Sequence, residues 1–206
     1  MHLEFLVEEW STKEFLIQVL PKILQPEISY KIHDFRGKTD LLKKLSARLK
    51  GYKAWIPDDY KIVVIVDRDE EDCQQLKKKL EQIAKDVGFI TKSTVQSKEN
   101  FQVLNRIAIE ELEAWFFGDV KAIIQAYPKV SKHLNKKEKY RDPDAITGGT
   151  WEALERGLQK AGYHQGGLEK VKATKEISAY MNPQENCSKS FQIFYNGLLE
   201  LISYND

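Results

Sequence analysis

The sequence has few cysteines, no long apolar run and no excess of one charge. Its 206 residues include only two cysteines, which lie far apart and form no CxxC pair, so we expect neither a disulfide framework nor a zinc site. No run approaches the ~18 apolar residues of a transmembrane helix, and the first residues lack a signal-peptide pattern. The 32 basic and 31 acidic residues nearly balance, so bulk charge favours neither nucleic acid nor membrane as a partner. These absences predict a cytoplasmic protein with reduced thiols and no membrane association.

Motifs for nucleotide-driven or nucleophilic chemistry are missing as well. The chain has no GxxxxGK[ST] loop and no GxGxxG turn, so it shows no sign of a nucleotide motor of its own. Its four histidines are scattered, and no Ser-His-Asp arrangement can be argued. Carboxylates therefore remain as the residues on which an enzymatic function would depend.

Apolar runs alternate with amphipathic stretches through the first part of the chain. Buried strands are expected at 3–7, 62–66 and 103–109, and a weaker one at 28–33. Helical patterns fall between them, and Ser11 with Glu14 fits a capping box at the start of the first helix. Strands and helices that alternate through short connections predict an α/β fold, with a mostly parallel sheet of about four strands flanked by helices.

The pattern changes after Pro128. The next residues, 129–144, are polar and strongly basic. Three helical stretches follow, at 151–161, 168–181 and 188–202. We therefore divide the chain into an α/β core, residues 1–127, and a helical C-terminal extension, residues 128–206, that packs on the core.

Acidic clusters follow three of the expected core strands. Asp67 and Asp69 come after the buried strand in KIVVIVDRDEEDC, Glu8 follows the first strand, and Glu113 lies past the fourth. Because the carboxyl ends of parallel strands share one edge, residues far apart in sequence would converge there. Carboxylates aimed at one point repel unless a hard cation such as Mg²⁺ lies between them. The alternative is a set of solvated helix caps, since acidic residues also favour helix N-termini.

Five segments carry a resemblance to known proteins: FLVEEWSTKEFL, FRGKTDLLKKL, VVIVDRDEEDC, NRIAIEELEAWFFGD and NCSKSFQIF. Their order and spacing resemble the DUF4276 family of Toprim-like proteins over nearly the whole chain. A glutamate that closes the first strand and an Asp-x-Asp that closes a later buried strand resemble the Toprim domain. Topoisomerases, bacterial primases and overcoming-lysogenization-defect (OLD) family nucleases share that domain. The resemblance implies a compact, Rossmann-like Toprim core with a helical C-terminal extension.

The resemblance also implies roles for individual residues. Glu8 is similar to the Toprim glutamate that serves as a metal ligand or as a general acid or base, and Glu9 stands where Toprim domains usually have glycine. Asp67 and Asp69 resemble the DxD ligands of Mg²⁺ or Mn²⁺. Glu113 resembles the further acidic residue that helps to hold a second metal in OLD-like nucleases.

Two cations near the same edge are candidates for contact with a substrate phosphate. Lys38 follows a glycine turn after the second strand, and Arg106 precedes the acidic segment. An exposed turn for Lys38 and an ion pair with the glutamates for Arg106 are the alternatives. Glu110 and Glu113, spaced i, i+3, are expected on one helix face. Lysines at 132–141 and 170–175 fit a nucleic-acid backbone track or solvated surfaces.

The leading hypothesis is a Mg²⁺-dependent nuclease or phosphotransfer subunit that acts on DNA or RNA. If the protein is an active enzyme, we expect it to be a metal-dependent endonuclease. The alternative implied by the resemblance is a non-catalytic Toprim-like module that works beside a separate ATPase, as in anti-phage defence systems. A third, weaker hypothesis is a small-molecule phosphohydrolase that uses the same carboxylates. The sequence decides neither the kind of nucleic acid nor the oligomeric state.

Overall fold

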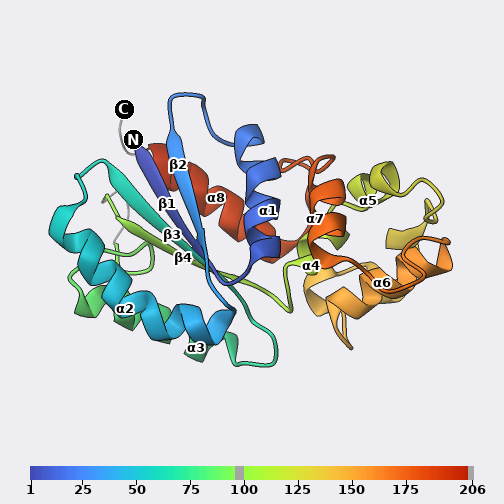
Figure 1. The fold of residues 1–206 in the computed structure, drawn as a ribbon, viewed down its shortest axis with the longest axis horizontal. Coiled ribbons are helices and arrows are strands. Elements are labelled where there is room, and N and C mark those ends of the chain that lie inside the picture. Colours follow the sequence, from blue (N-terminus) through green and yellow to red (C-terminus); the bar gives the residue numbers. More distant parts are fainter. Residues whose placement is uncertain (96–99, 204–206) are drawn as a thin grey trace.

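Four strands form a single sheet in the computed structural model, which describes residues 1–95 and 100–203. The strands are β1 (His2–Val7), β2 (Ser29–Asp34), β3 (Tyr60–Asp67) and β4 (Val103–Ala108). Their order across the sheet is β2-β1-β3-β4, and every neighbouring pair is parallel (Figure 1). The predicted α/β class with a parallel four-stranded sheet is confirmed.

Helices connect the strands and complete the chain. The first three strands are followed in turn by α1 (Trp10–Val19), α2 (Lys38–Trp55) and α3 (Cys73–Asp86). After β4 come α4 (Glu113–Phe117), α5 (Val120–Ala126), α6 (Thr150–Lys160), α7 (Lys170–Ser178) and α8 (Lys189–Ser203). Within the described ranges, no helix is long and apolar enough to cross a bilayer.

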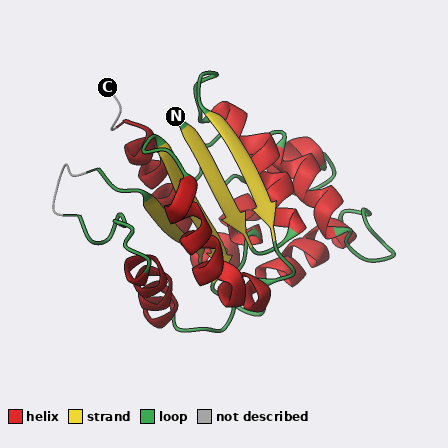
Figure 2. Ribbon diagram, turned by 60° about the vertical axis from the view of Figure 1, so that its left-hand side comes forward, coloured by secondary structure: helices red, strands yellow, loops and turns green. Residues whose placement is uncertain are grey.

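The sheet lies between two helical layers, which Figure 2 shows on its two sides. One layer contains α1 and α8, whose Phe15 and Phe194 share a buried cluster with Val63 of β3. The other layer contains α2 and α3, whose leucines are buried with Leu6 of β1 and Val64 of β3. Successive residues of a strand point to opposite faces of the sheet. The apolar run of β3 therefore fills both cores, as its continuous hydrophobicity predicts.

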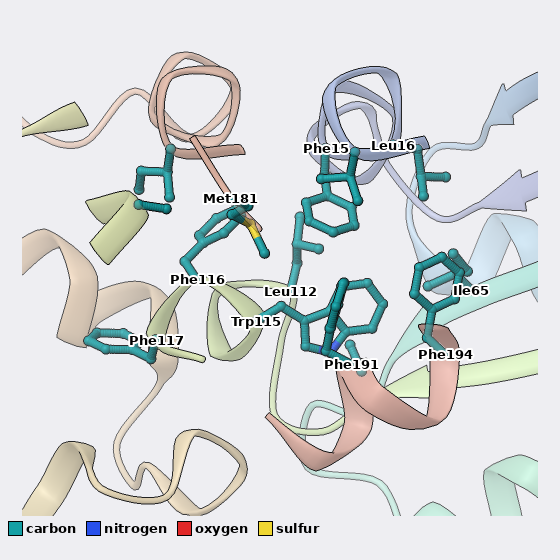
Figure 3. Packing of buried hydrophobic residues seen from close by; sticks show 14 of the residues in the cluster. Phe15, Leu16, Ile65, Leu112, Trp115, Phe116, Phe117, Met181, Phe191 and Phe194 are labelled. Carbon is teal, nitrogen blue, oxygen red and sulfur yellow. The ribbon is translucent and has the colours of Figure 1, made fainter. Parts of the chain in front are cut away.

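The first of these cores continues from the sheet into the C-terminal helices. Trp115 of α4 stacks on Phe194 with ring centroids 5.3 Å apart, and it lies 5.2 Å from the ring of Phe15 (Figure 3). Its indole N–H donates to Ser190 Oγ at 2.8 Å. The same buried cluster includes Leu154 of α6. Side-chain packing is thus continuous past residue 128, and the division into core and extension stays a prediction.

The start of α1 differs from the expected capping box. The helix begins at Trp10, and the residue before it, Glu9, is the N-cap. Ser11 is buried inside the first turn, where its hydroxyl donates to the Glu9 carboxylate. The expectation that Ser11 caps this helix is therefore wrong, because the helix starts earlier than the serine.

Candidate metal centre

β1 and β3 are neighbouring strands whose following helices lie on opposite faces of the sheet. α1 packs on the face that carries Val63, whereas α3 packs on the face that carries Val64. Such a switch point opens a crevice at the carboxyl ends of the two strands, where open α/β proteins bind their ligands. Glu8 directly follows β1, and Asp67 is the last residue of β3. The topology thus brings two of the predicted metal ligands to one place.

A hydrogen bond joins Glu8 and Asp67 at this edge. The backbone N–H of Asp67 donates to Glu8 Oε2 at 3.1 Å, and only 7% of Glu8 and 3% of Asp67 are exposed. Burial raises the pKa of Glu8 to about 7, although this hydrogen bond acts in the opposite direction. Burial and then the charges of Glu8 and Glu113 raise the pKa of Asp67 well above its ordinary value. Their ionised forms are therefore disfavoured unless a cation joins them.

Glu113 is the third member of this carboxylate group. It begins α4 and is fully buried, and neither of its carboxylate oxygens has a hydrogen-bond partner among the described residues. Burial raises its pKa to about 7, and Lys170 opposes that effect. A buried carboxylate without a hydrogen bond is costly, because its desolvation is not compensated. The orphaned oxygens of Glu113 indicate that this position is built for a partner.

Lys170 brings a positive charge to the group from α7, which lies beside α1 (Figure 1). Its Nζ lies 2.6 Å from Glu9 Oε1 and 3.8 Å from Glu113 Oε1. Burial alone would lower the pKa of Lys170, but the charges of Glu113, Glu9 and Asp67 outweigh it and raise that pKa. The same ammonium lies 5.7 Å from the centre of the Trp151 ring. A helix of the predicted extension thus contributes to the edge that the sheet builds.

Lys38 and Asp69 form a second, more exposed group at the carboxyl edge. Lys38 Nζ lies 2.7 Å from Asp69 Oδ2 and 2.9 Å from Glu71 Oε1. It also donates to the carbonyl oxygens of Asp67 and Arg68, at 3.0 and 3.1 Å. The ammonium of Lys38 therefore has four oxygen partners and holds the loop that follows β3.

Asp67 and Asp69, expected to face one point, have different surroundings. Asp67 is buried beside Glu8, whereas the side chain of Asp69 is 49% exposed and pairs with Lys38. The backbone gives the reason. Asp69 has a left-handed φ of +50°, and its N–H bonds to the carbonyl oxygen of Glu110 at 2.9 Å. The chain leaves the strand conformation there, so the alternation of β3 no longer sets the direction of this side chain. The metal role of Asp69 stays a prediction.

Glu110 and Arg106 do not join the buried carboxylates. Glu110 has a φ of +63° and precedes α4, so the expectation that it shares a helix face with Glu113 is wrong. Its carboxylate pairs with Arg68 instead. Arg106 donates from Nε to the carbonyl oxygen of Ile193 in α8 at 3.0 Å. The structure places Arg106 against α8, and its proposed contact with a phosphate stays untested.

Other acidic residues near this edge have structural roles. Asp72 caps α3, because its Oδ1 accepts from the backbone N–H of Gln75 at 2.8 Å. Glu111 accepts from Thr150 Oγ1 at 2.8 Å at the start of α6. Glu9 has φ −149° and ψ 169°, an extended conformation that any residue adopts, so the turn after Glu8 does not require glycine. The helix-cap alternative is thus confirmed for part of the acidic set, but not for the buried carboxylates.

The carboxylates of Glu8, Asp67 and Glu113 suit a hard divalent cation in chemistry, although they are not arranged as a coordination shell. In residues 1–95 and 100–203, no three Asp, Glu, His or Cys side chains are arranged to hold a metal ion. Glu8, Asp67 and Glu113 still supply the carboxylate oxygens that Mg²⁺ prefers. The buried Glu113 carboxylate, which has no hydrogen bond and only a 3.8 Å contact with Lys170, is the structural observation that favours such an ion. The residues therefore fit the ion in chemistry, and binding would require them to draw together.

Comparison with known proteins places the chain in a family. Residues 7–199 match the family described as "Domain of unknown function (DUF4276)". The chain belongs to the DUF4276 family. Among solved structures it is similar to the C-terminal region of the Xanthomonas campestris pv. campestris OLD protein, with 12% identity and a TM-score of 0.47. That alignment covers 98% of this chain and 95% of the other. No curated protein matches the chain.

Sequence reasoning missed the part that Lys170 has in this DUF4276 protein. It placed Lys170 on a basic helical face, with no link to the carboxylates. The contact arises only because α7 packs on α1 and carries the lysine to Glu9. No spacing in the sequence connects these residues, so only a tertiary structure could show it.

Proposed function

We propose that this DUF4276 protein is a Toprim-type, Mg²⁺- or Mn²⁺-dependent phosphodiesterase that cuts nucleic acid. The observation that carries the proposal is the burial of three carboxyl groups, those of Glu8, Asp67 and Glu113, near the switch point of a parallel sheet, where burial and the charges of Glu8 and Glu113 raise the pKa of Asp67. Strongly perturbed pKa values from burial and like charge are more frequent at functional sites than elsewhere. The resemblance of Glu8 and the Asp-x-Asp to Toprim residues supports the same chemistry.

Glu8, Asp67 and Glu113 would hold the cation. A Mg²⁺ ion bound there would supply Lewis acidity to a phosphodiester and lower the pKa of an attacking water. Glu8 would also serve as the general acid or base, accepting a proton from water and returning it to a leaving oxygen. Burial raises its pKa to about 7 in the metal-free protein, and a bound cation would favour the ionised form that accepts the proton. Burial of all three carboxyl groups excludes bulk water and strengthens their attraction for a cation.

Asp69 and Lys38 belong to the proposal as the outer part of the same site. The charge of Asp69 already raises the pKa of Glu8, so the two carboxylates act on each other. Lys38 would hold the loop after β3 in place and offer its charge to a phosphate. Lys170 would restrain Glu9 and Glu113 from α7.

A cleavage assay tests this proposal. The purified full chain is incubated with supercoiled plasmid, single-stranded DNA or RNA in the presence of Mg²⁺ or Mn²⁺. We expect the wild type to cleave, and Asp67→Asn and Glu113→Gln to lose on the order of 100-fold in rate. Glu70→Gln removes an exposed carboxylate from the loop that follows Asp67 and should cleave like the wild type. Equal rates for all four proteins would overturn the proposal.

The position of Lys170 favours a second candidate function. Because its ammonium already offsets the charges of Glu9 and Glu113, the edge can be stable without a metal. The chain would then be a non-catalytic Toprim-like module that works with a partner such as a separate ATPase, as in anti-phage defence systems. A stable complex with an ATPase, together with no heat of Mn²⁺ binding in calorimetry, would support this candidate over the nuclease.

A further inference from the structure

An exposed tryptophan stands beside the carboxylate edge. Trp10 is the first residue of α1 and comes two residues after Glu8, and 49% of it is exposed. An indole gains free energy when it is buried, so one left half-exposed beside a candidate site invites a functional explanation. The residue between them, Glu9, contacts Lys170 of α7. The indole is therefore tied by the chain to the end of β1, where Glu8 lies.

A cation lies over one face of the indole. Lys13 Nζ lies 4.5 Å from the centre of the Trp10 ring and 2.7 Å from Asp34 Oδ1, at the end of β2. The hydrogen bond from Lys13 lowers the pKa of Asp34 and keeps its carboxylate ionised, which fixes the lysine in this place. Lys13 thus links the ring of Trp10 to the end of β2, while about half of Trp10 faces solvent. A stacked base needs a π-face of this kind, and a nearby ammonium suits its phosphate.

A ring and a cation lie together at two places near the carboxyl edge of the sheet. On the β2 side Trp10 lies with Lys13, and on the α6 side the half-buried Trp151 lies with Lys170. The exposed Arg36 follows β2 in the loop at the same edge. Interleaved aromatic and basic side chains bind single strands, because unpaired bases can unstack onto rings while cations follow the phosphates. Bases of a duplex are stacked on one another and cannot use such a ring without being flipped out.

We propose that Trp10 is a stacking platform for an unpaired base, and that the site takes single-stranded nucleic acid in preference to a duplex. This inference rests on the proposed function for its ligand class, since it names the substrate of the same crevice. The stacking itself does not require a metal or cleavage. Binding without metal therefore separates the two proposals experimentally.

The test is fluorescence anisotropy with short labelled single-stranded DNA, single-stranded RNA and duplex DNA, in chelator, on the full chain. We expect Trp10→Ala to weaken single-strand binding roughly 10-fold or more, the loss of one stacked base, and Trp10→Phe to retain most of the affinity. Trp55→Ala is the matched control, because Trp55 is 60% exposed but packs beside Tyr60 at the opposite, amino end of β3. It should bind like the wild type.

Each result decides between the proposals. Affinity for single strands that is unchanged in Trp10→Ala, or reduced equally in Trp55→Ala, would overturn the stacking platform. If Trp10→Ala loses duplex binding as much as single-strand binding, the preference for unpaired bases is overturned. If the wild type cuts nothing while Trp10→Ala still loses single-strand binding, the platform stands and the nuclease proposal fails. A loss of either single-stranded DNA or single-stranded RNA binding in Trp10→Ala supports the platform. The strand that the wild type binds more tightly identifies the preferred kind of nucleic acid.

Discussion

Glu8 Oε2 accepts a hydrogen bond from the backbone N–H of Asp67 at 3.1 Å, between the two neighbouring strands whose following helices lie on opposite faces of the sheet. This bond ties the end of β1 to the end of β3 and holds two buried carboxyl groups together. Glu113 is buried close enough that its charge raises the pKa of Asp67. Burial raises the pKa of all three groups, so the stability of the fold should depend on their protonation.

The metal-free protein should become less stable as the pH rises from about 5 to 8. Burial raises the pKa values of Glu8 and Glu113 from 4.5 to about 7, so the folded state binds protons more tightly than the unfolded state. This contribution to the free energy of unfolding is fully present below pH 4.5 and is lost as the pH rises through 7. Urea unfolding in chelator across this range measures it.

Glu113→Gln should flatten that pH dependence, because one of the titrating groups is gone. The substitution should remove at most about 3 kcal/mol of the pH-dependent part of the free energy of unfolding, since one pKa unit corresponds to about 1.4 kcal/mol. Glu70→Gln should keep the wild-type dependence. Parallel curves for the wild type and Glu113→Gln would show that this carboxyl group does not titrate in the window.

Lys170→Met should destabilise the metal-free protein at neutral pH by roughly 1–3 kcal/mol. Removing one partner of a largely buried ion pair leaves the other charges uncompensated, and partial exposure of Lys170 reduces the cost below that of a fully buried pair. The double variant with Glu113→Gln should lose less than the two single changes predict, because their effects are coupled. Lys172→Met, on an exposed lysine of the same helix, is the control for urea unfolding. Equal stabilities of the two lysine variants would contradict the role of Lys170.

Lys38→Met should loosen the loop after β3. The ammonium donates to the carbonyl oxygens of Asp67 and Arg68 and pairs with Asp69 and Glu71, so its removal frees the loop from four contacts. We expect backbone amide hydrogens of residues 68–71 to exchange several-fold faster in hydrogen-exchange mass spectrometry. The exposed Lys43 on the same helix provides the control, Lys43→Met. Unchanged exchange in Lys38→Met would show that the loop does not depend on this lysine.

Gly118→Ala should destabilise the attachment of α4 to the segment before α8. A Cβ atom at Gly118 would lie 2.0 Å from Asn186 Oδ1 and 2.9 Å from the backbone nitrogen of Ser188. Asn186 cannot move freely, because its Nδ2 donates to the carbonyl oxygen of Trp115 at 2.7 Å. We expect a loss of roughly 2–3 kcal/mol in thermal or urea unfolding. At Gly157 of α6 an added Cβ meets open space, so Gly157→Ala should be neutral or slightly stabilising.

The sheet and part of the candidate site could be predicted because local patterns determine them. The apolar run at 62–66 lies inside β3 (Tyr60–Asp67), and the other expected strands fall within a residue or two of the observed ones. β1 and β3 are neighbouring parallel strands, so their carboxyl ends, with Glu8 and Asp67, lie at the same edge of the sheet.

The rest of the site depends on turns and tertiary packing that leave no local pattern. Asp69 and Glu110 adopt positive φ angles that the strand and helix patterns do not predict, and their side chains pair with Lys38 and Arg68. Arg106 donates to the carbonyl oxygen of Ile193 because α8 packs against β4. Lys170 reaches Glu9 only through the packing of α7 on α1. These positions follow from how whole helices sit on the sheet, and not from sequence spacing.

The central claim is that Glu8, Asp67 and Glu113 form a divalent-cation site. Its most direct test is calorimetric titration of Mn²⁺ into the full chain, with Asp67→Asn, Glu113→Gln and the control Glu70→Gln. We expect saturable binding by the wild type and the control, with affinity at least about 10-fold weaker in the two carboxylate variants. No binding by the wild type, or equal affinity in all four proteins, would contradict the account.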